Sequence, residues 1–207
     1  MTEIPIILAS ESPRRKQLLD QIDIKCTVIP SEIEEEKPKR ENPMDYAVRL
    51  ASAKASAIAK THPDGLVIGA DTIVVLNDEI LGKPADRNDA IRILSKLSGK
   101  THTVITGVSI QSINHKVASD FYEETTVSFK NINDSDIYKY IDTYKPFDKA
   151  GSYGIQDPFT VWIRSINGCF FNVMGFPLSS FFERFRTIIS QIDNKKRNTV
   201  GGKSSAL

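Results

Sequence analysis

The chain starts with a short and nearly continuous apolar run. Residues 3–9 read EIPIILA, and such a run suits a strand that is buried on both faces. Ser12 and Pro13 follow, and this pair is typical of a helix N-cap and the first helical residue. The chain therefore begins as strand, turn and helix.

Further elements follow from the spacing of apolar residues. Asn42-Pro43 repeats the cap pattern and starts a second helix, on which Lys54 is the odd member of an apolar face. Alternating polar and apolar residues in 103–111 and 116–129 predict two antiparallel strands with one solvated face. The remaining predicted strands are 25–29, 66–76, 80–81 and 159–166, and the remaining predicted helices are 86–97, 134–144 and 177–192.

The length of 207 residues favours one domain, because domains run to roughly 100–200 residues. From Asn194 onward the residues are polar and small. We therefore predict a single domain over 1–193 and a disordered tail over 194–207.

Composition narrows the choice of partners and compartment. The formal net charge is +1, which gives no broad field for nucleic acid or for an anionic membrane. No apolar stretch approaches the roughly 18 residues of a membrane span, and the N-terminus lacks the features of a signal peptide. Cys26 and Cys169 share no metal-ligand spacing and suit a reducing compartment. We expect a cytoplasmic protein that binds neither nucleic acid nor membrane.

Two segments place chemically useful side chains beside predicted strands. Residues 10–15 read SESPRR, and a helix N-terminus with two Arg and two hydroxyls can hold phosphate. The segment SPRR by itself more often indicates an ordinary capped helix with solvated Arg side chains. Asp71 lies inside the apolar strand GADTIVV. An ionised carboxylate there needs a cation or a metal, unless Gly69 makes a bend that exposes it.

Three further signals are weak when taken alone. The acidic residues of 32–36 suit either a solvated loop or a Mg²⁺ or Mn²⁺ site. Lys83 lies between Gly and Pro, in a segment that also suits a plain turn. Residues 148–156 read DKAGSYGIQ, where Tyr153 offers a stacking face and Gln156 offers a donor and an acceptor for a base edge.

Taken in order, these segments resemble one known family. The segments are ILASESPRR, the acidic loop ending at Glu35, GADTIVVL, LGKP, LSGKTHTVITGV, DKAGSYGIQ and VMGFP. This series resembles the Maf family of nucleoside triphosphate pyrophosphatases, and DKAGSYGIQ is similar to the subgroup that acts on dTTP and UTP. The resemblance implies a two-lobed α/β fold, with a long curved mixed sheet flanked by helices and the active site in the cleft between the lobes.

The resemblance also implies a role for each candidate residue. Glu35, Asp71 and Gln156 would form the site for Mg²⁺ or Mn²⁺ and the attacking water, with Asp71 or Glu35 as the base. The residues that would bind the substrate are Ser10, Arg14, Arg15, Lys54, Thr72, Lys83, Tyr153 and Gln156.

Three positions depart from the family pattern. Ser152 stands where Ala is usual, Phe176 stands where Leu is usual, and Asp157-Pro158-Phe159 replaces a continuation rich in Gly. The last of these adjoins Gln156 and therefore bears on substrate preference. The expected reaction is hydrolysis of a nucleoside triphosphate to the monophosphate and pyrophosphate, by a chain that could form a homodimer. The alternative is a nucleotide-binding regulator of cell division or septum formation without turnover, which leaves the acidic residues unexplained.

Overall fold

The computed structural model describes residues 4–34, 38 and 41–201. The strands are β1 (Ile6–Ala9), β2 (Thr27–Val28), β3 (Leu66–Leu76), β4 (Glu79–Leu81), β5 (Thr101–Ser112), β6 (Val117–Phe129) and β7 (Ile163–Asn167). The helices are α1 (Pro13–Gln21), α2 (Pro43–Thr61), α3 (Arg87–Leu97), α4 (Asp134–Tyr144), α5 (Phe170–Val173) and α6 (Leu178–Gly201), with 3₁₀ turns η1 (Ala150–Ser152) and η2 (Pro158–Trp162).

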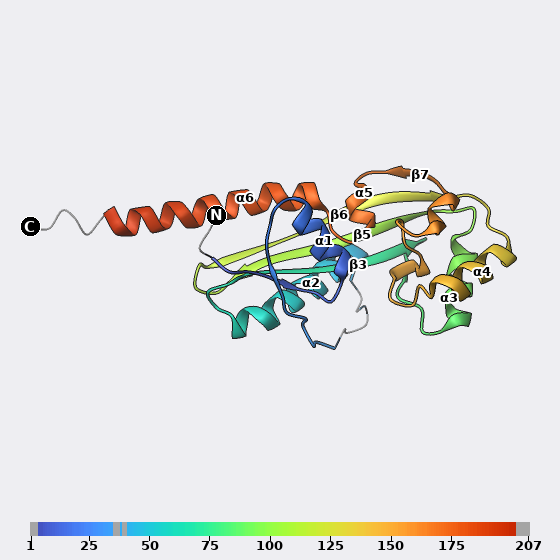
Figure 1. The fold of residues 1–207 in the computed structure, drawn as a ribbon, viewed down its shortest axis with the longest axis horizontal. Helices are drawn as coiled ribbons and strands as arrows, with labels where there is room; N and C mark the ends of the chain where they lie inside the picture. Colours follow the sequence, from blue (N-terminus) through green and yellow to red (C-terminus); the bar gives the residue numbers. More distant parts are fainter. Residues whose placement is uncertain (1–3, 35–37, 39–40, 202–207) are drawn as a thin grey trace, which may run out of the picture.

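All the strands join one mixed sheet. Its order is β2-β1-β3-β5-β6-β7, with β4 paired to β3. The pairs β2-β1 and β1-β3 are parallel, and the remaining pairs are antiparallel. Helices flank this sheet in two groups, with α1, α2 and α6 toward one end and α3 and α4 toward the other (Figure 1). The predicted α/β fold with a long mixed sheet is confirmed.

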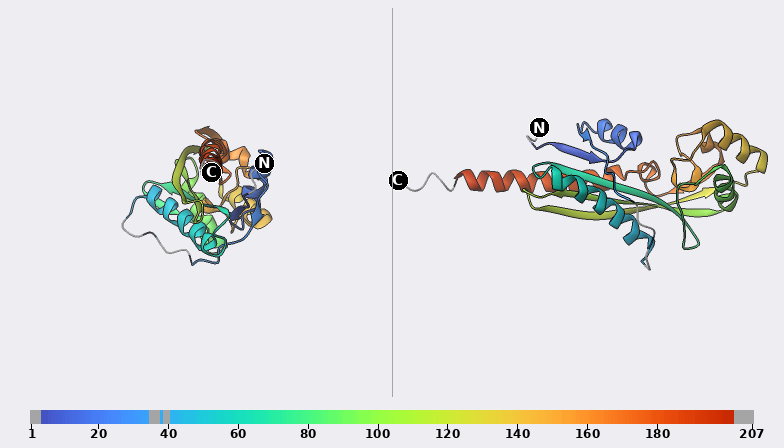
Figure 2. Two further views of the ribbon diagram at one scale, coloured as in Figure 1. Left: turned by 90° about the vertical axis from the view of Figure 1, so that its left-hand side faces the viewer. Right: turned by 90° about the horizontal axis from the view of Figure 1, so that it is seen from below.

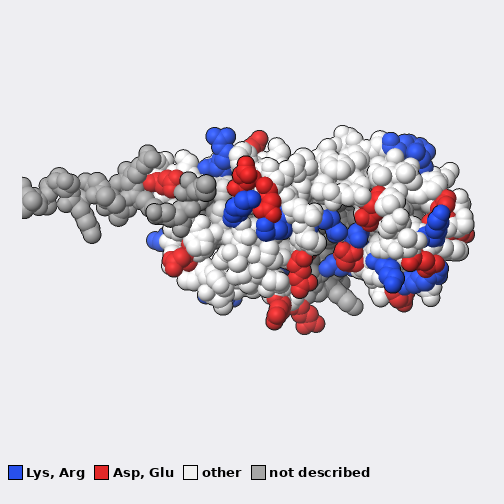
Figure 3. All heavy atoms as spheres, viewed as in Figure 1, with Lys and Arg blue, Asp and Glu red and all other residues white. Residues whose placement is uncertain are grey.

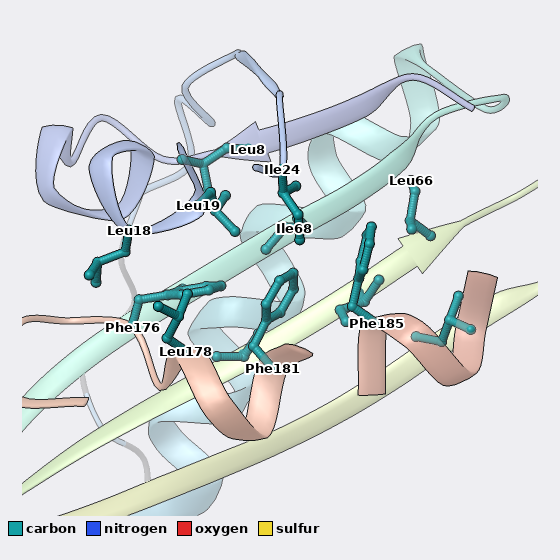
Figure 4. Close-up of a cluster of buried hydrophobic side chains, with 14 of the residues drawn as sticks. Leu8, Leu18, Leu19, Ile24, Leu66, Ile68, Phe176, Leu178, Phe181 and Phe185 are labelled. Atoms are coloured by element: carbon teal, nitrogen blue, oxygen red, sulfur yellow. The ribbon is translucent and has the colours of Figure 1, made fainter. Parts of the chain in front are cut away.

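The first strand is buried on both faces, as its apolar run predicts. Leu8 packs into the core beneath α1 and α6, together with Leu19 and Phe181. Figure 4 shows Phe181 and its neighbours on α6 directed toward the strands. Ile7 points the other way and packs with Ala55 of α2. Successive residues of a strand face opposite sides, so each apolar residue of β1 contributes to one of two cores.

Helix α2 lies unusually close to its face of the sheet because two strand residues there are glycines. A Cβ on Gly69 of β3 would lie 2.2 Å from the carbonyl oxygen of Ala51, and one on Gly107 of β5 would lie 2.4 Å from that of Ala47. Gly69 therefore serves the close packing of a helix. This approach brings Lys54 of α2 to Asp71, which is paired with Gly107 across the ladder.

Three expectations about the elements are wrong. Strand β5 is buried on both faces through residues 104–110, because α2 covers one face and α5 packs on the other. The predicted strand 159–166 begins as the turn η2, since Phe159 is buried in an aromatic cluster. Helix α6 continues to Gly201, beyond its predicted end at residue 192, because no Gly or Pro interrupts residues 178–200.

Figure 1 and the right-hand view of Figure 2 show that α6 extends beyond the end of the sheet. Across the described ranges 4–34, 38 and 41–201, no helix combines the length and the apolar character that a membrane span requires.

Candidate active site

The cavity that gathers the predicted residues lies where one edge of β3 has no strand beside it. Strand β1 pairs with this edge as far as Gly69, and β4 pairs with it from Val74 onward. Asp71 and Thr72 lie between these two limits. The end of β1 leads into the turn at Ser10, and the end of β4 leads toward Lys83. The gap is therefore bordered by the turns that follow two strands, a usual place for a ligand in α/β sheets.

The cavity has a volume of about 310 Å³. It contains nine of the ten predicted site residues, which come from α1, α2, β3 and the loops after β1, β4 and α4. These nine are Ser10, Arg14, Arg15, Lys54, Asp71, Thr72, Lys83, Tyr153 and Gln156. The tenth, Glu35, lies outside the described residues. The structure thus brings the nine together, and their individual roles remain predictions.

Both signs of charge meet in this cavity. Among the described residues, its lining includes the basic side chains of Arg14, Arg15, Lys54, Lys83 and Lys149 and the acidic side chains of Glu11, Asp71, Asp148 and Asp157. On the face drawn in Figure 3, basic and acidic side chains gather where the surface is hollowed between the two groups of helices. An anion can be held here by local charges although the whole chain is nearly neutral.

Arg15 is built into the wall of the cavity. Arg15 is 9% exposed, and its Nε donates to the carbonyl oxygen of Gly175 at 2.8 Å. Nη1 donates to Ser10 Oγ and to the carbonyl oxygen of Ala70, and Nη2 donates to Thr72 Oγ1. These bonds use four of the five guanidinium N–H groups, so at most one is left for a phosphate. Arg15 thus joins α1, β3 and the loop before α6.

The adjacent Arg14 has a different environment. Its side chain is 28% exposed, and Nη1 lies 3.6 Å from Asp148 Oδ2. Arg14 belongs to α1, whereas Asp148 belongs to the loop between α4 and η1, so this ion pair crosses the cavity. A partly exposed guanidinium can turn toward a bound phosphate at little cost.

Asp71 has the local partner that its burial requires. Lys54 Nζ donates to Asp71 Oδ1 at 2.6 Å, and the two side chains are only 12% and 11% exposed. The two charges offset one another in a site of low dielectric. The pair places a carboxylate and an ammonium side by side at the open edge of β3.

Tyr153 lies in the wall of the cavity. The residue is 6% exposed, and its ring packs against Phe129 and Phe159. Its hydroxyl lies 2.8 Å from His102 Nε2. Burial raises the pKa of the Tyr153 hydroxyl above its ordinary range. These contacts hold Tyr153 in the loop, and its stacking on a base stays a prediction.

The comparisons with known proteins show the family of this chain. A family model described as "Maf-like protein" matches residues 5–188. The chain belongs to the Maf family. The match covers α1 to α5, the first part of α6 and every residue of the cavity, so the Maf family resemblance drawn from the seven segments is confirmed.

Individual relatives of this Maf protein carry a more specific name. The dTTP/UTP pyrophosphatase of Bacillus pumilus is 44% identical over 174 residues, which are 84% of this chain and 91% of the relative. That of Thermosipho africanus is 48% identical over 178 residues, 86% of this chain and 90% of the relative. A solved structure of the Staphylococcus aureus Ham1 protein aligns with a TM-score of 0.45 and 17% identity, over 60% of this chain and 71% of that one.

One basic residue of this cavity, Lys149, is not among the residues predicted from the sequence. Lys149 lines the cavity with its side chain 13% exposed, and its Nζ lies 2.9 Å from Asp148 Oδ1 and 3.7 Å from Asp157 Oδ2. It stands within the segment DKAGSYGIQ, so the signal was present, but a single Lys in a loop carries no periodicity that distinguishes it. Asp157 in turn accepts a hydrogen bond from Tyr140 of α4 at 3.0 Å.

The donor types at the cavity fit a hard cation. Asp71 offers carboxylate oxygens and Gln156 an amide oxygen, and Mg²⁺ is commonly bound by one or two carboxylates together with substrate phosphates. No group of three or more His, Cys, Asp or Glu side chains arranged for a metal occurs among the described residues. Glu35, the third predicted ligand, lies outside them.

The His102–Tyr153 contact leads to a prediction about pH. Burial lowers the pKa of His102 to about 4, while the unfolded chain has a His pKa near 6.5. The unfolded state therefore takes up a proton first, and the stability contributed by neutral His102 is present above about pH 6.5 and lost as the pH falls toward about 4.

We expect protonation linked to His102 to lower the free energy of unfolding by about 2 kcal/mol when the pH is lowered from 7 to 5. His102→Gln, which cannot titrate, should show a loss that is smaller by that amount. Urea denaturation at both pH values measures the difference. An equal loss in both proteins would contradict the assignment.

Proposed function

We propose that this Maf protein hydrolyses dTTP and UTP to the monophosphate and pyrophosphate. One observation carries the proposal. The side chains predicted to bind a nucleoside triphosphate lie far apart in the sequence, and nine of the ten predicted site residues line a single cavity. The names of the relatives, which match over most of their length, support the substrates. The cytoplasm is the compartment we propose, and free Cys26 and Cys169 are compatible with it.

The reaction is attack of water on the α-phosphorus. The water oxygen forms a bond to phosphorus while the bond to the bridging oxygen of the β-phosphate breaks, and pyrophosphate leaves with that electron pair. Transfer of this kind depends mainly on positioning and charge neutralisation. Arg14, Lys83 and Lys149 bind the phosphates, and Arg15 keeps the turn at Ser10 in place. A proton leaves the water as it attacks.

Asp71 is the residue we propose to orient the water and accept its proton, with Glu35 as the alternative base. The hydrogen bond from Lys54 Nζ holds the Asp71 carboxylate in place at the open edge of β3. As phosphate enters, Lys54 can share its protons between the carboxylate and a phosphate oxygen.

A divalent cation, Mg²⁺ or Mn²⁺, completes the proposed site. Asp71, Gln156 and Glu35 would hold it. When bound, it would neutralise part of the triphosphate's roughly −4 charge and polarise a phosphoryl oxygen.

A panel of nucleoside triphosphates tests the proposal. We expect kcat/KM for pyrophosphate release to be roughly tenfold or more higher with dTTP and UTP than with ATP and GTP, and to fall to background after chelation of divalent cations. Similar kcat/KM for purine substrates would contradict the substrate assignment, and would direct attention to Asp157, which borders the cavity beside Gln156. Tight dTTP binding without any turnover would favour the non-catalytic regulator.

A further inference from the structure

One carboxylate in the cavity occupies a place where a phosphate would be expected. Asp148 lies between two cations, with Oδ1 2.9 Å from Lys149 Nζ and Oδ2 3.6 Å from Arg14 Nη1. All three residues line the same cavity. The two oxygens of the Asp148 carboxylate thus bridge Arg14 of α1 and Lys149 of the loop between α4 and η1, as two oxygens of a phosphate group could do.

The charge of Asp148 conflicts with a polyanionic ligand unless the side chain can leave. Burial alone would raise the pKa of its carboxyl, but the hydrogen bond and charge of Lys149 and the charge of Arg14 hold that pKa below its ordinary value. A permanently charged carboxylate at this position would repel the nearest phosphate. It also competes with that phosphate for both cations.

Asp148 differs from the neighbouring acid in how firmly it is held. Asp157 is 26% exposed and is anchored by the hydroxyl of Tyr140. The side chain of Asp148 is 61% exposed, and that of its partner Arg14 is 28% exposed. A change of rotamer can therefore carry the Asp148 carboxylate into solvent, where water replaces its partners.

We propose that Asp148 is an internal counter-ion, which the phosphates of the substrate displace from Arg14 and Lys149 and which returns as the product leaves. The proposal rests on the proposed function in that the site binds a triphosphate. In this role Asp148 limits how tightly the site retains pyrophosphate. It lowers the affinity for the product while keeping the two cations positioned between turnovers.

Titration of inorganic pyrophosphate by calorimetry tests the proposal without turnover. Asp148→Asn should bind pyrophosphate about threefold to tenfold more tightly than the parent at low salt, because an exposed charge acts through a high effective dielectric constant. The gain should shrink as added salt screens the charges. Asp148→Glu, which restores the carboxylate, should return the affinity to within about twofold of the parent.

A matched control comes from a second Arg–Asp pair. Asp142 of α4 accepts hydrogen bonds from Arg87 at 2.6 and 2.9 Å, and its side chain is 54% exposed. Among the described residues, it is outside the set that lines the cavity. Asp142→Asn should leave the pyrophosphate affinity unchanged, so a gain in this variant as well would overturn the proposal.

The effect of Asp148→Asn is compared with and without Lys149, one of its two partner cations. In a Lys149→Gln background, Asp148→Asn should gain less affinity than in the parent, because one of the two competed cations is absent. An unchanged or weaker affinity in Asp148→Asn, an equal gain in both backgrounds, or no measurable pyrophosphate binding in either protein would overturn the proposal.

The outcome is separable from that of the proposed function. A parent protein that fails to hydrolyse dTTP, together with a tighter pyrophosphate complex in Asp148→Asn, would refute the activity and leave the counter-ion in place. A parent that hydrolyses dTTP, with no gain in Asp148→Asn, would give the reverse result.

Discussion

Replacing Asp71 with Asn is expected to lower kcat for pyrophosphate release by roughly 10²–10⁴-fold, the usual scale for a lost general base. Asn keeps the size of the side chain and can still accept a hydrogen bond from Lys54 Nζ, which lies 2.6 Å from Oδ1. The fold should therefore persist. Nucleotide binding should persist as well, because Arg14, Lys83 and Lys149 remain in the cavity.

Kinetics and calorimetry on the same protein separate these effects. Loss of Lys83, as in Lys83→Gln, should instead weaken nucleotide binding together with turnover, because the proposed function places this cation on a phosphate in the ground state as well. A folded Asp71→Asn protein with kcat within a few-fold of the parent would transfer the role of base to Glu35.

Arg15→Lys should reduce the free energy of unfolding by about 2–4 kcal/mol, because it breaks a buried hydrogen-bond network. A Lys ammonium has three donors on a narrower head and cannot reach the acceptors of Gly175, Ala70, Ser10 and Thr72 together. Buried acceptors left without a donor account for most of the loss.

Arg14→Lys provides the matched control in the same helix. Its side chain is 28% exposed and makes an ion pair across 3.6 Å, so its replacement should change the free energy of unfolding by less than about 1 kcal/mol. Denaturant titrations of both variants measure the contrast. If Arg15→Lys proved as stable as Arg14→Lys, Arg15 would have to be reassigned from the wall of the site to phosphate binding.

The elements with strong local signals could be predicted from the sequence. Helix α2 starts at Pro43 with Asn42 as its cap, whose side chain accepts a hydrogen bond from the backbone N–H of Asp45. Strand β3 spans Leu66–Leu76, the full range of its apolar run. In such segments the apolar periodicity and the terminal residues agree with the tertiary structure.

The site could be predicted as a set of residues but only partly as a set of roles. Arg14 and Arg15 are adjacent and chemically identical, and only the fold distinguishes the partly exposed Arg14 from the buried Arg15. Tyr153 suits base stacking in sequence, yet Phe129 and Phe159 pack around its ring. These differences arise from contacts between segments far apart in the chain, which local patterns do not encode.

The two groups of helices share their strands, and this has a mechanical consequence. Strands β3, β5 and β6 contain 11, 12 and 13 residues, or about 36–43 Å of continuous hydrogen-bonded ladder at about 3.3 Å per residue. A hinge requires a few residues whose backbone torsions can change freely, whereas a ladder of three long strands can yield only through a small change of twist spread along its length. Among the residues that the structure describes, adjustment to a ligand therefore falls to side chains and to the loop at 148–157, and the strands contribute little change in the width of the cleft. Little binding energy is then consumed in closing the site around a nucleotide, and free and bound forms should superimpose closely in their strands.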